Sequence, residues 1–315
     1  MIRKIMIGTI GMVLLCMVAC GNAGNKEQGT RGEQVVKQEQ KKRGFQLPEV
    51  PVMLNTPAQR AAYVAKHYWD HFDFADTVYI HLPDITEQAI VNFMDLMNHV
   101  PQDVETIAIQ TLFKQAAPHS RMLWHFWETM SNYWHDPNSP IKNEEKFIAM
   151  CRSVEALPQV EETLRQRASY ARTLAEKNRI GTKAIDFVYT LVSGRQGKLY
   201  DLKAKYTLLF FYNPDCHTCT DIKQAMKNSL LLQNMVGSGE MKVLTVYPDE
   251  DLNLWREKLP EMANEWINGY DKGQVLTLEQ RYDLSSIPSF YLLDKDKRVV
   301  LKDADWRQIL QFFEK

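Results

Sequence analysis

The sequence predicts an α+β protein of two domains, an N-terminal all-helical domain followed by an α/β domain. Apolar residues recur at helical spacing between residues 46 and 179, and the pattern becomes strand-like from Ile180 onward. The chain has 315 residues, of which 45% are hydrophobic, which is enough for two packed cores. The formal net charge is -1, so no nucleic-acid partner is expected.

Residues 1–20 have the pattern of a signal peptide. Arg3 and Lys4 give a positive start, and the apolar run from Ile5 to Val18 is too short for a comfortable membrane span. The run ends in small residues before Cys20, which resembles the lipobox of bacterial lipoproteins and implies lipidation of Cys20. Because two or three acyl chains anchor a protein stably, we expect a membrane-anchored lipoprotein of the bacterial cell envelope that faces the periplasm. An ordinary secretory signal that is cut elsewhere is the alternative.

Residues 21–45 are expected to form a flexible tether, because they are rich in Gly, Gln, Lys, Glu and Asn and cannot bury a core. The helical domain is expected over 46–179. Three of its predicted helices are recognised by their starts, at Thr56-Pro57, at a capping Thr86 and near Asn143. The other three are predicted to span Val104–Ala116, Ser120–Trp134 and Val160–Lys177. The segment Thr77–Ile80 is ambiguous between strand and helix.

The α/β domain is expected over 180–315, with helices and strands that follow one another along the chain. The run Lys205–Tyr212 is almost continuously apolar, as in a central strand that is buried on both faces. The other predicted strands are Phe187–Val192, Met241–Tyr247, Phe290–Leu293 and Val299–Leu301, and the predicted helices are Cys216–Met235, Leu252–Leu259 and Trp306–Phe313.

The cysteines indicate redox chemistry. Of the five, Cys16 leaves with the signal and Cys20 is consumed by lipid. The remaining pair Cys216 and Cys219 is close in sequence, and export places it in an oxidising compartment, so it is expected to be redox-active. Cys151 lies in a helical pattern and is expected to be a small buried hydrophobe.

The segment 213–219 lies between a buried strand and the start of a helix. Backbone N–H groups at a helix start favour negative charge, so the thiolate of Cys216 is stabilised there, and Cys219 lies one turn away and can close a disulfide. Half a zinc site has the same spacing, but no second pair of cysteines exists. His67 and His71 have the spacing of a helical metal pair but are expected to be packed or solvated, so neither a metal nor a cofactor is expected.

Residues 180–315 resemble the thioredoxin superfamily, in particular the TlpA/ResA-like branch of exported thiol oxidoreductases. The resemblance is carried by four segments: Ala184-Ile185-Asp186-Phe187, Leu199–Lys203, Cys216-His217-Thr218-Cys219 and Tyr282–Asp294. It implies a thiol–disulfide oxidoreductase in which Cys216 and Cys219 are catalytic, Pro288 is the cis-proline beside them, and Ile287 offers backbone groups to an extended substrate chain. The helical region loosely resembles an uncharacterised module ahead of thioredoxin domains in Bacteroidetes-type lipoproteins.

The resemblance also implies partners: cysteine-containing exported proteins, and a transmembrane electron donor that could reduce the pair. Whether the protein reduces or oxidises its partners stays open.

Three positions depart from the family pattern. Phe210 stands where many members have a buried Asp that accepts the proton of the second cysteine, Asp215 replaces a Trp, and Ile185 replaces a Pro. We therefore expect Asp215, Asp249 or Glu250 to act as the proton acceptor. His217 is expected either to stabilise the thiolate or to be an exposed side chain, and the negative charge of Asp215 disfavours the thiolate.

Two other functions are alternatives. A non-catalytic protein- or peptide-binding lipoprotein is suggested by the aromatic residues Trp124, Phe126, Trp127, Tyr133 and Trp134, most of which are nevertheless expected in the core. A peroxidase is less favoured, because Asn213 stands where such families have a threonine.

Overall fold

The computed structural model describes residues 44–314. The predicted signal peptide with Cys20, and residues 21–43 of the predicted tether, lie outside the described residues. Within 44–314, no helix combines the length and the apolar character that a membrane span requires.

An N-terminal helical region precedes the sheet, as predicted. The helical elements are α2 (Pro57–His67), the 3₁₀ helix η1 (Thr77–His81), α3 (Thr86–Leu96), α4 (Gln102–Ala116), α5 (Ser120–Trp134), α6 (Glu144–Glu155) and α7 (Glu162–Ala175).

Some of the described helices start at a side-chain cap, and others do not. The Thr56 side chain accepts a hydrogen bond from the backbone of Gln59, with Pro57 in the first turn, as the sequence predicts. The predicted cap at Thr86 is wrong: this residue is already inside α3, and its buried hydroxyl donates instead to the carbonyl of Tyr79. The segment Thr77–Ile80 belongs to the 3₁₀ helix η1 rather than to a strand.

Most of the aromatic side chains of α5 lie in the helical core. Phe126, Trp127 and Trp134 are buried, and the ring of Phe126 meets that of Trp69 edge to face. Tyr133 is half-buried and donates a hydrogen bond to Glu87 over 2.6 Å. This burial removes the observation that motivated a non-catalytic binding surface on α5.

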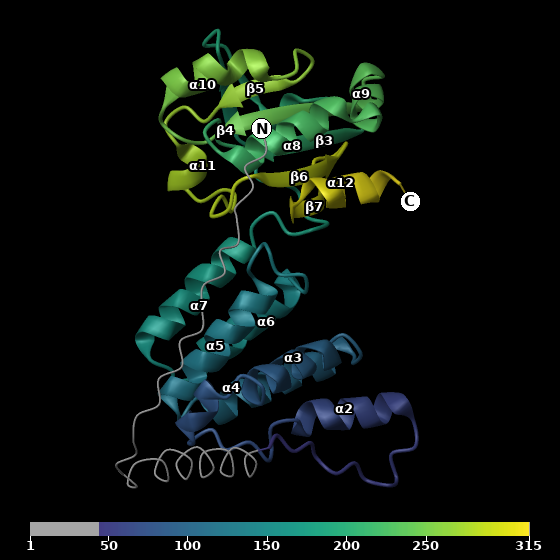
Figure 1. Ribbon diagram of the computed structural model, residues 1–315, viewed down its shortest axis with the longest axis vertical. Coiled ribbons are helices and arrows are strands. Elements are labelled where there is room, and N and C mark those ends of the chain that lie inside the picture. Colours follow the sequence, from purple (N-terminus) through teal and green to yellow (C-terminus); the bar gives the residue numbers. More distant parts are fainter. Residues whose placement is uncertain (1–43, 315) are drawn as a thin grey trace, which may run out of the picture. The chain divides into compact units, whose positions relative to one another are not determined.

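The C-terminal region folds into a thioredoxin-like α/β sheet domain (Figure 1). Among the described residues, seven strands pair in the order β2-β1-β5-β4-β3-β6-β7. The strands are β1 (Val188–Leu191), β2 (Gln196–Lys198), β3 (Tyr206–Phe211), β4 (Met241–Tyr247), β5 (Ile267–Tyr270), β6 (Ser289–Asp294) and β7 (Val299–Ala304). The helices are η2 (Leu199–Asp201), α8 (His217–Asn228), α9 (Leu230–Gly237), α10 (Leu252–Lys258), η3 (Leu259–Glu261), α11 (Val275–Leu278) and α12 (Trp306–Phe313).

The central strand β3 is buried on both faces, as its apolar run predicts. It pairs parallel with β4 and antiparallel with β6. Its side chains alternate between two cores: Leu208 and Phe210 pack with Met226 of α8, whereas Leu209 and Phe211 pack on the opposite face. The strand ends at Phe211, and the loop that follows it leads to the cysteine pair.

The structure differs from the prediction at several elements of this region. The helix predicted over Cys216–Met235 is two helices, because Ser229 has extended backbone and caps α9 through its side chain. The short strand β2, which pairs with β1, was not among the predicted strands. The sequence analysis missed both β5 and the four-residue helix α11.

Candidate functional site

Cys216 is the N-cap residue of α8. Its backbone is extended, and its sulfur accepts a hydrogen bond of 3.1 Å from the backbone N–H of Cys219. The carbonyl of Cys216 accepts the next helical hydrogen bond, from the N–H of Thr220. The sulfur thus takes the place of a capping oxygen at the helix start, where negative charge is favoured.

Cys219 lies one turn into α8 and points into the core. It is 2% exposed, while Cys216 is half-buried, and both are free thiols. Burial, followed by the hydrogen bond with Cys216, raises the pKa of Cys219 to about 12, although the backbone of Asn213 favours the ionised form. The two sulfurs therefore differ in environment: one borders solvent at the helix start and the other is held protonated in the core.

Asn213 links the loop before the cysteines to the end of β4. Its side-chain amide donates to the carboxylate of Asp249 over 2.7 Å, and its side-chain oxygen accepts from the N–H of Asp215 over 2.9 Å. The carboxylates of Asp215 and Glu250 are exposed. Of the three acids expected near the pair, Asp249 is thus the one joined by a side-chain hydrogen bond to a residue that contacts Cys219.

Phe210, at the position of the family's buried acid, lies below the cysteines in the core. Its ring stacks on that of Phe290 with centroids 4.6 Å apart, and it shares a core cluster with Cys219. Because this position holds an apolar ring, it supplies no proton acceptor.

His217 is the first residue of α8 and lies between the two cysteines in sequence. Its side chain is 92% exposed, and its Nε2 is 3.6 Å from the carboxylate of Asp221 in the next turn.

The segment before β6 carries the proline that the resemblance identified. The Ile287–Pro288 peptide bond is cis, as expected. Ile287 packs against the same core cluster as Cys216, and Pro288 lines a cavity together with Thr218, the residue between His217 and Cys219. Hence the cysteine motif and the cis-proline border one opening of the domain.

The sequence analysis missed an ion pair beside Cys219. Lys223, one turn further along α8, is 4% exposed, and its Nζ lies 2.5 Å from the carboxylate of Glu261. With Cys219 it lines a hollow of about 10 Å³, close to the space that one water molecule needs. Hydrogen bonding to Lys223 lowers the pKa of Glu261. The only sequence signal was a lysine at i+4 from a cysteine, which is too common to be informative.

The other candidates lie apart from this centre. The helix α2 ends at His67, so His67 and His71 do not share a helical face; His67 pairs with Asp70 over 2.7 Å. Among residues 44–314, no three His, Cys, Asp or Glu side chains form a metal-binding group. Cys151 is fully buried, and burial raises its pKa far above the usual range.

Comparison with known proteins agrees with the two-part organisation of the chain. Residues 19–178 match the family described as a domain of unknown function (DUF5106), and residues 204–299 match a thioredoxin-like family. The thiol-disulfide oxidoreductase ResA of Bacillus thuringiensis (strain Al Hakam) is 28% identical over 125 residues, which is 40% of this chain and 69% of that protein.

A crystal structure of a thioredoxin-like protein from Bacteroides caccae matches over both parts of the chain. It is 44% identical, covers 86% of this chain and 98% of its own, and has a TM-score of 0.78. The crystal structure of the C-terminal domain of an uncharacterized protein from Bacteroides fragilis is 46% identical over 44% of this chain and 99% of its own, with a TM-score of 0.43. The chain therefore belongs to the family of thioredoxin-like proteins that carry an N-terminal DUF5106 domain.

Proposed function

We propose that this protein is an exported, lipid-anchored thiol–disulfide oxidoreductase that acts on cysteines of envelope proteins through Cys216 and Cys219. In this proposal, residues 1–20 are a signal peptide, Cys20 carries the lipid, and residues 21–45 tether the folded part to the membrane. The partners are cysteine-containing exported proteins and a membrane electron donor.

The observation that carries the proposal is the asymmetry between the two sulfurs. Cys216 caps α8 at the surface and accepts a hydrogen bond from the N–H of Cys219, which stabilises a negative sulfur. Cys219 is buried, so an incoming disulfide meets Cys216 first. An attacking thiolate and a protected resolving thiol are the two parts that disulfide exchange requires.

The reductive direction proceeds in two steps. The thiolate of Cys216 attacks one sulfur of a substrate disulfide; the substrate S–S bond breaks, a mixed disulfide forms, and the other substrate sulfur leaves as a thiolate. Cys219 then loses its proton and attacks the sulfur of Cys216, which forms the Cys216–Cys219 disulfide and releases the second substrate thiolate. The two electrons of the dithiol pass to the substrate, and the oxidative direction is the exact reverse.

The second step needs an acceptor for the proton of Cys219. We assign this role to Asp249, because Asn213 connects it to the motif: the side chain of Asn213 donates to Asp249, and its backbone favours the ionised form of Cys219. We also assign Lys223 as a positioning residue, because this buried lysine lines the same hollow as Cys219 and a positive charge nearby favours the ionised form of a thiol.

Trapping tests the function directly. The Cys219→Ala variant keeps the attacking sulfur and lacks the resolving one, so it should accumulate mixed disulfides with envelope proteins, and these should disappear on reduction. Cys216→Ala is the matched control: the thiols that it keeps among the described residues, Cys151 and Cys219, are both buried, so it should trap nothing. If the Cys219→Ala variant traps no more protein than this control, the chain is not an oxidoreductase of envelope thiols.

A further inference from the structure

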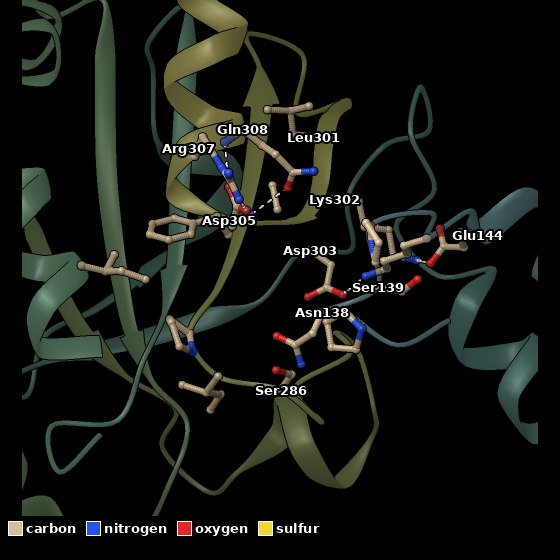
Figure 2. Close-up of a pocket in the computed structure, with 18 of the residues that line it drawn as sticks. Asn138, Ser139, Glu144, Ser286, Leu301, Lys302, Asp303, Asp305, Arg307 and Gln308 are labelled. Carbon is tan, nitrogen blue, oxygen red and sulfur yellow. Dashed lines mark hydrogen bonds and ion pairs between the residues drawn. The ribbon is translucent and has the colours of Figure 1, made fainter. Parts of the chain in front are cut away.

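A cavity of about 910 Å³ begins at the cysteine motif and extends to the helical region (Figure 2). Thr218, Ile287 and Pro288 line its end near the cysteines. Its size lies in the range of about 300 to 1,000 Å³ that is typical of ligand sites. One end of the cavity is therefore bordered by the segment that carries the cysteine pair.

Residues 137–142, the loop between α5 and α6, form part of the cavity wall. Figure 2 shows Asn138, Ser286 and Asp303 grouped on one side of the space and Asp305, Arg307 and Gln308 on another. The wall is thus built by both domains, although only one of them carries the cysteines.

Ion pairs hold this loop against the edge strand β7. Lys142 forms an ion pair with Asp303, which also accepts a hydrogen bond of 2.9 Å from Ser289. At the start of α6, the carboxylate of Glu144 lies 2.6 Å from Nζ of Lys302, a side chain that is 5% exposed. These contacts fix the loop with partly or fully buried charges, so the wall is part of the folded structure rather than a loose segment.

The loop also has internal support. Asn143 donates its N–H to the carbonyl of Trp134 over 2.9 Å, and the hydroxyl of Ser139 donates to the carbonyl of Tyr133 over 2.5 Å. Two prolines, Pro137 and Pro140, restrict its backbone. Asn138 is exposed at the tip between them, and its contacts are to the neighbouring Asp136.

The chemistry of the lining indicates the occupant. Three acidic and three basic residues of the lining balance in charge, because they form three ion pairs: Lys142 with Asp303, Lys302 with Glu144, and Arg307 with Asp305. The remaining polar groups are uncharged amides and hydroxyls, interspersed with Ile222, Ile287 and Leu301. Such a lining suits the backbone and uncharged side chains of an extended polypeptide rather than an ionic small molecule.

We propose that the DUF5106 domain forms one wall of the substrate site, and that residues 137–142 bind the polypeptide segment next to the substrate's reactive cysteine. This inference rests on the proposed oxidoreductase function and gives the helical domain a role in choosing polypeptide substrates. Asn138 is a specificity residue in this account, because it faces the occupant without touching either cysteine of the motif.

The test compares two disulfides on the full mature protein: a short uncharged peptide joined through one cysteine to glutathione, and the small disulfide cystamine. Asn138→Trp should raise KM for the peptide about tenfold and change the rate with cystamine by less than about twofold. The matched control is Asn132→Trp, an exposed asparagine on α5 that does not line the cavity, and it should change neither rate. Lys142→Met, which frees the loop from β7, should act on the peptide in the same direction.

Equal effects of Asn138→Trp on both disulfides, or no effect on either, would overturn the inference. A wild-type protein that exchanges with neither disulfide would instead remove the proposed function, and this inference with it. A second measurement is independent of turnover: a photo-crosslinking residue at position 138 in the Cys219→Ala variant should crosslink to a trapped peptide, whereas the same group at position 132 should not. A crosslink from position 132 alone would also contradict the inference.

Discussion

The backbone N–H of Cys219 lies 3.1 Å from the sulfur of Cys216 and donates a hydrogen bond to it. The two residues are thereby joined before any disulfide forms, with the acceptor at the surface and the donor residue in the core.

Alkylation of the reduced protein should be strongly ordered. At pH 8, a thiol with a pKa of about 12 is ionised in about one molecule in 10,000, and Cys219 is also buried. Iodoacetamide should therefore modify Cys216 first and Cys219 only at higher pH or on unfolding. Mass spectrometry of the modified peptides measures the order, and equal labelling at pH 8 would contradict it.

The resolving step should accelerate with pH, because Cys219 must lose its proton before it attacks. Below the raised pKa, the thiolate fraction of Cys219 grows about tenfold per pH unit, so the decay of a preformed mixed disulfide should approach this slope when no side chain takes the proton. Asp249→Asn should slow the decay near pH 7 and have less effect near pH 9, where hydroxide can take the proton. Stopped-flow measurement gives both rates.

Glu250→Gln is the matched control for Asp249→Asn, since its carboxylate is exposed. A triple variant combines Asp215→Asn, Asp249→Asn and Glu250→Gln. If its decay rate for the mixed disulfide depends on pH as in the wild type, none of these acids accepts the proton of Cys219.

Lys223→Met should slow resolution more than it affects stability. Methionine keeps most of the buried volume of the side chain but removes the positive charge of a residue that lines the same hollow as Cys219. The freed Glu261 is 43% exposed on its side chain and can be solvated, so the free energy of unfolding should fall by only about 1 kcal/mol or less. Lys227→Met, on the same helix but without a place in this hollow, is the control. Equal kinetic effects of the two variants would exclude a role for the Lys223 charge.

Cys151→Ala should leave thiol exchange unchanged. Cys151 is fully buried in α6, and its removal leaves a small cavity that should lower the free energy of unfolding by about 1 to 2 kcal/mol. Urea denaturation measures the stability, and exchange with cystamine measures the activity. A loss of exchange in the folded variant would show that the third thiol takes part in the chemistry.

Lys302→Met should destabilise the protein by about 2 kcal/mol or more. Its Nζ pairs with the carboxylate of Glu144 and donates hydrogen bonds to the carbonyls of Ala175 and Lys177. The substitution therefore removes the donor that this carboxylate and these two carbonyls share. The matched control is Arg307→Met: its side chain is 79% exposed and lies 3.5 Å from Asp305, so its loss should cost less than about 0.5 kcal/mol. Similar urea midpoints of unfolding for the two variants would refute a stabilising role for the Lys302 contacts.

Periodic segments could be predicted from the sequence, and irregular ones could not. The bounds of α5, β4 and α12 agree with prediction to the residue, because each has an unbroken helical or apolar pattern between clear end signals. Strand β5 has only four residues and contains Gly269, where a Cβ would lie 3.0 Å from the ring of Tyr189. The glycine fits a close contact with a residue that is distant in sequence, so no local pattern predicts this strand.

The same distinction applies to the site. The cysteine pair and the cis peptide bond before Pro288 could be predicted because they lie in contiguous motifs. The pair of Lys223 with Glu261, and that of Lys142 with Asp303, join residues 38 and 161 positions apart. Only the folded chain brings such residues together, so the wall that the helical domain contributes to the cavity had no signal in the sequence.

The reduction potential of the Cys216–Cys219 pair tests the central claim most directly. The mature Cys151→Ala protein is equilibrated in buffers of defined thiol–disulfide ratio, and the free thiols are then alkylated and counted. The account predicts one reversible two-electron transition between about −120 and −270 mV, the span of thiol oxidoreductases that exchange with their partners. Independent oxidation of the two thiols, or a disulfide that stays oxidised below about −300 mV, would contradict it.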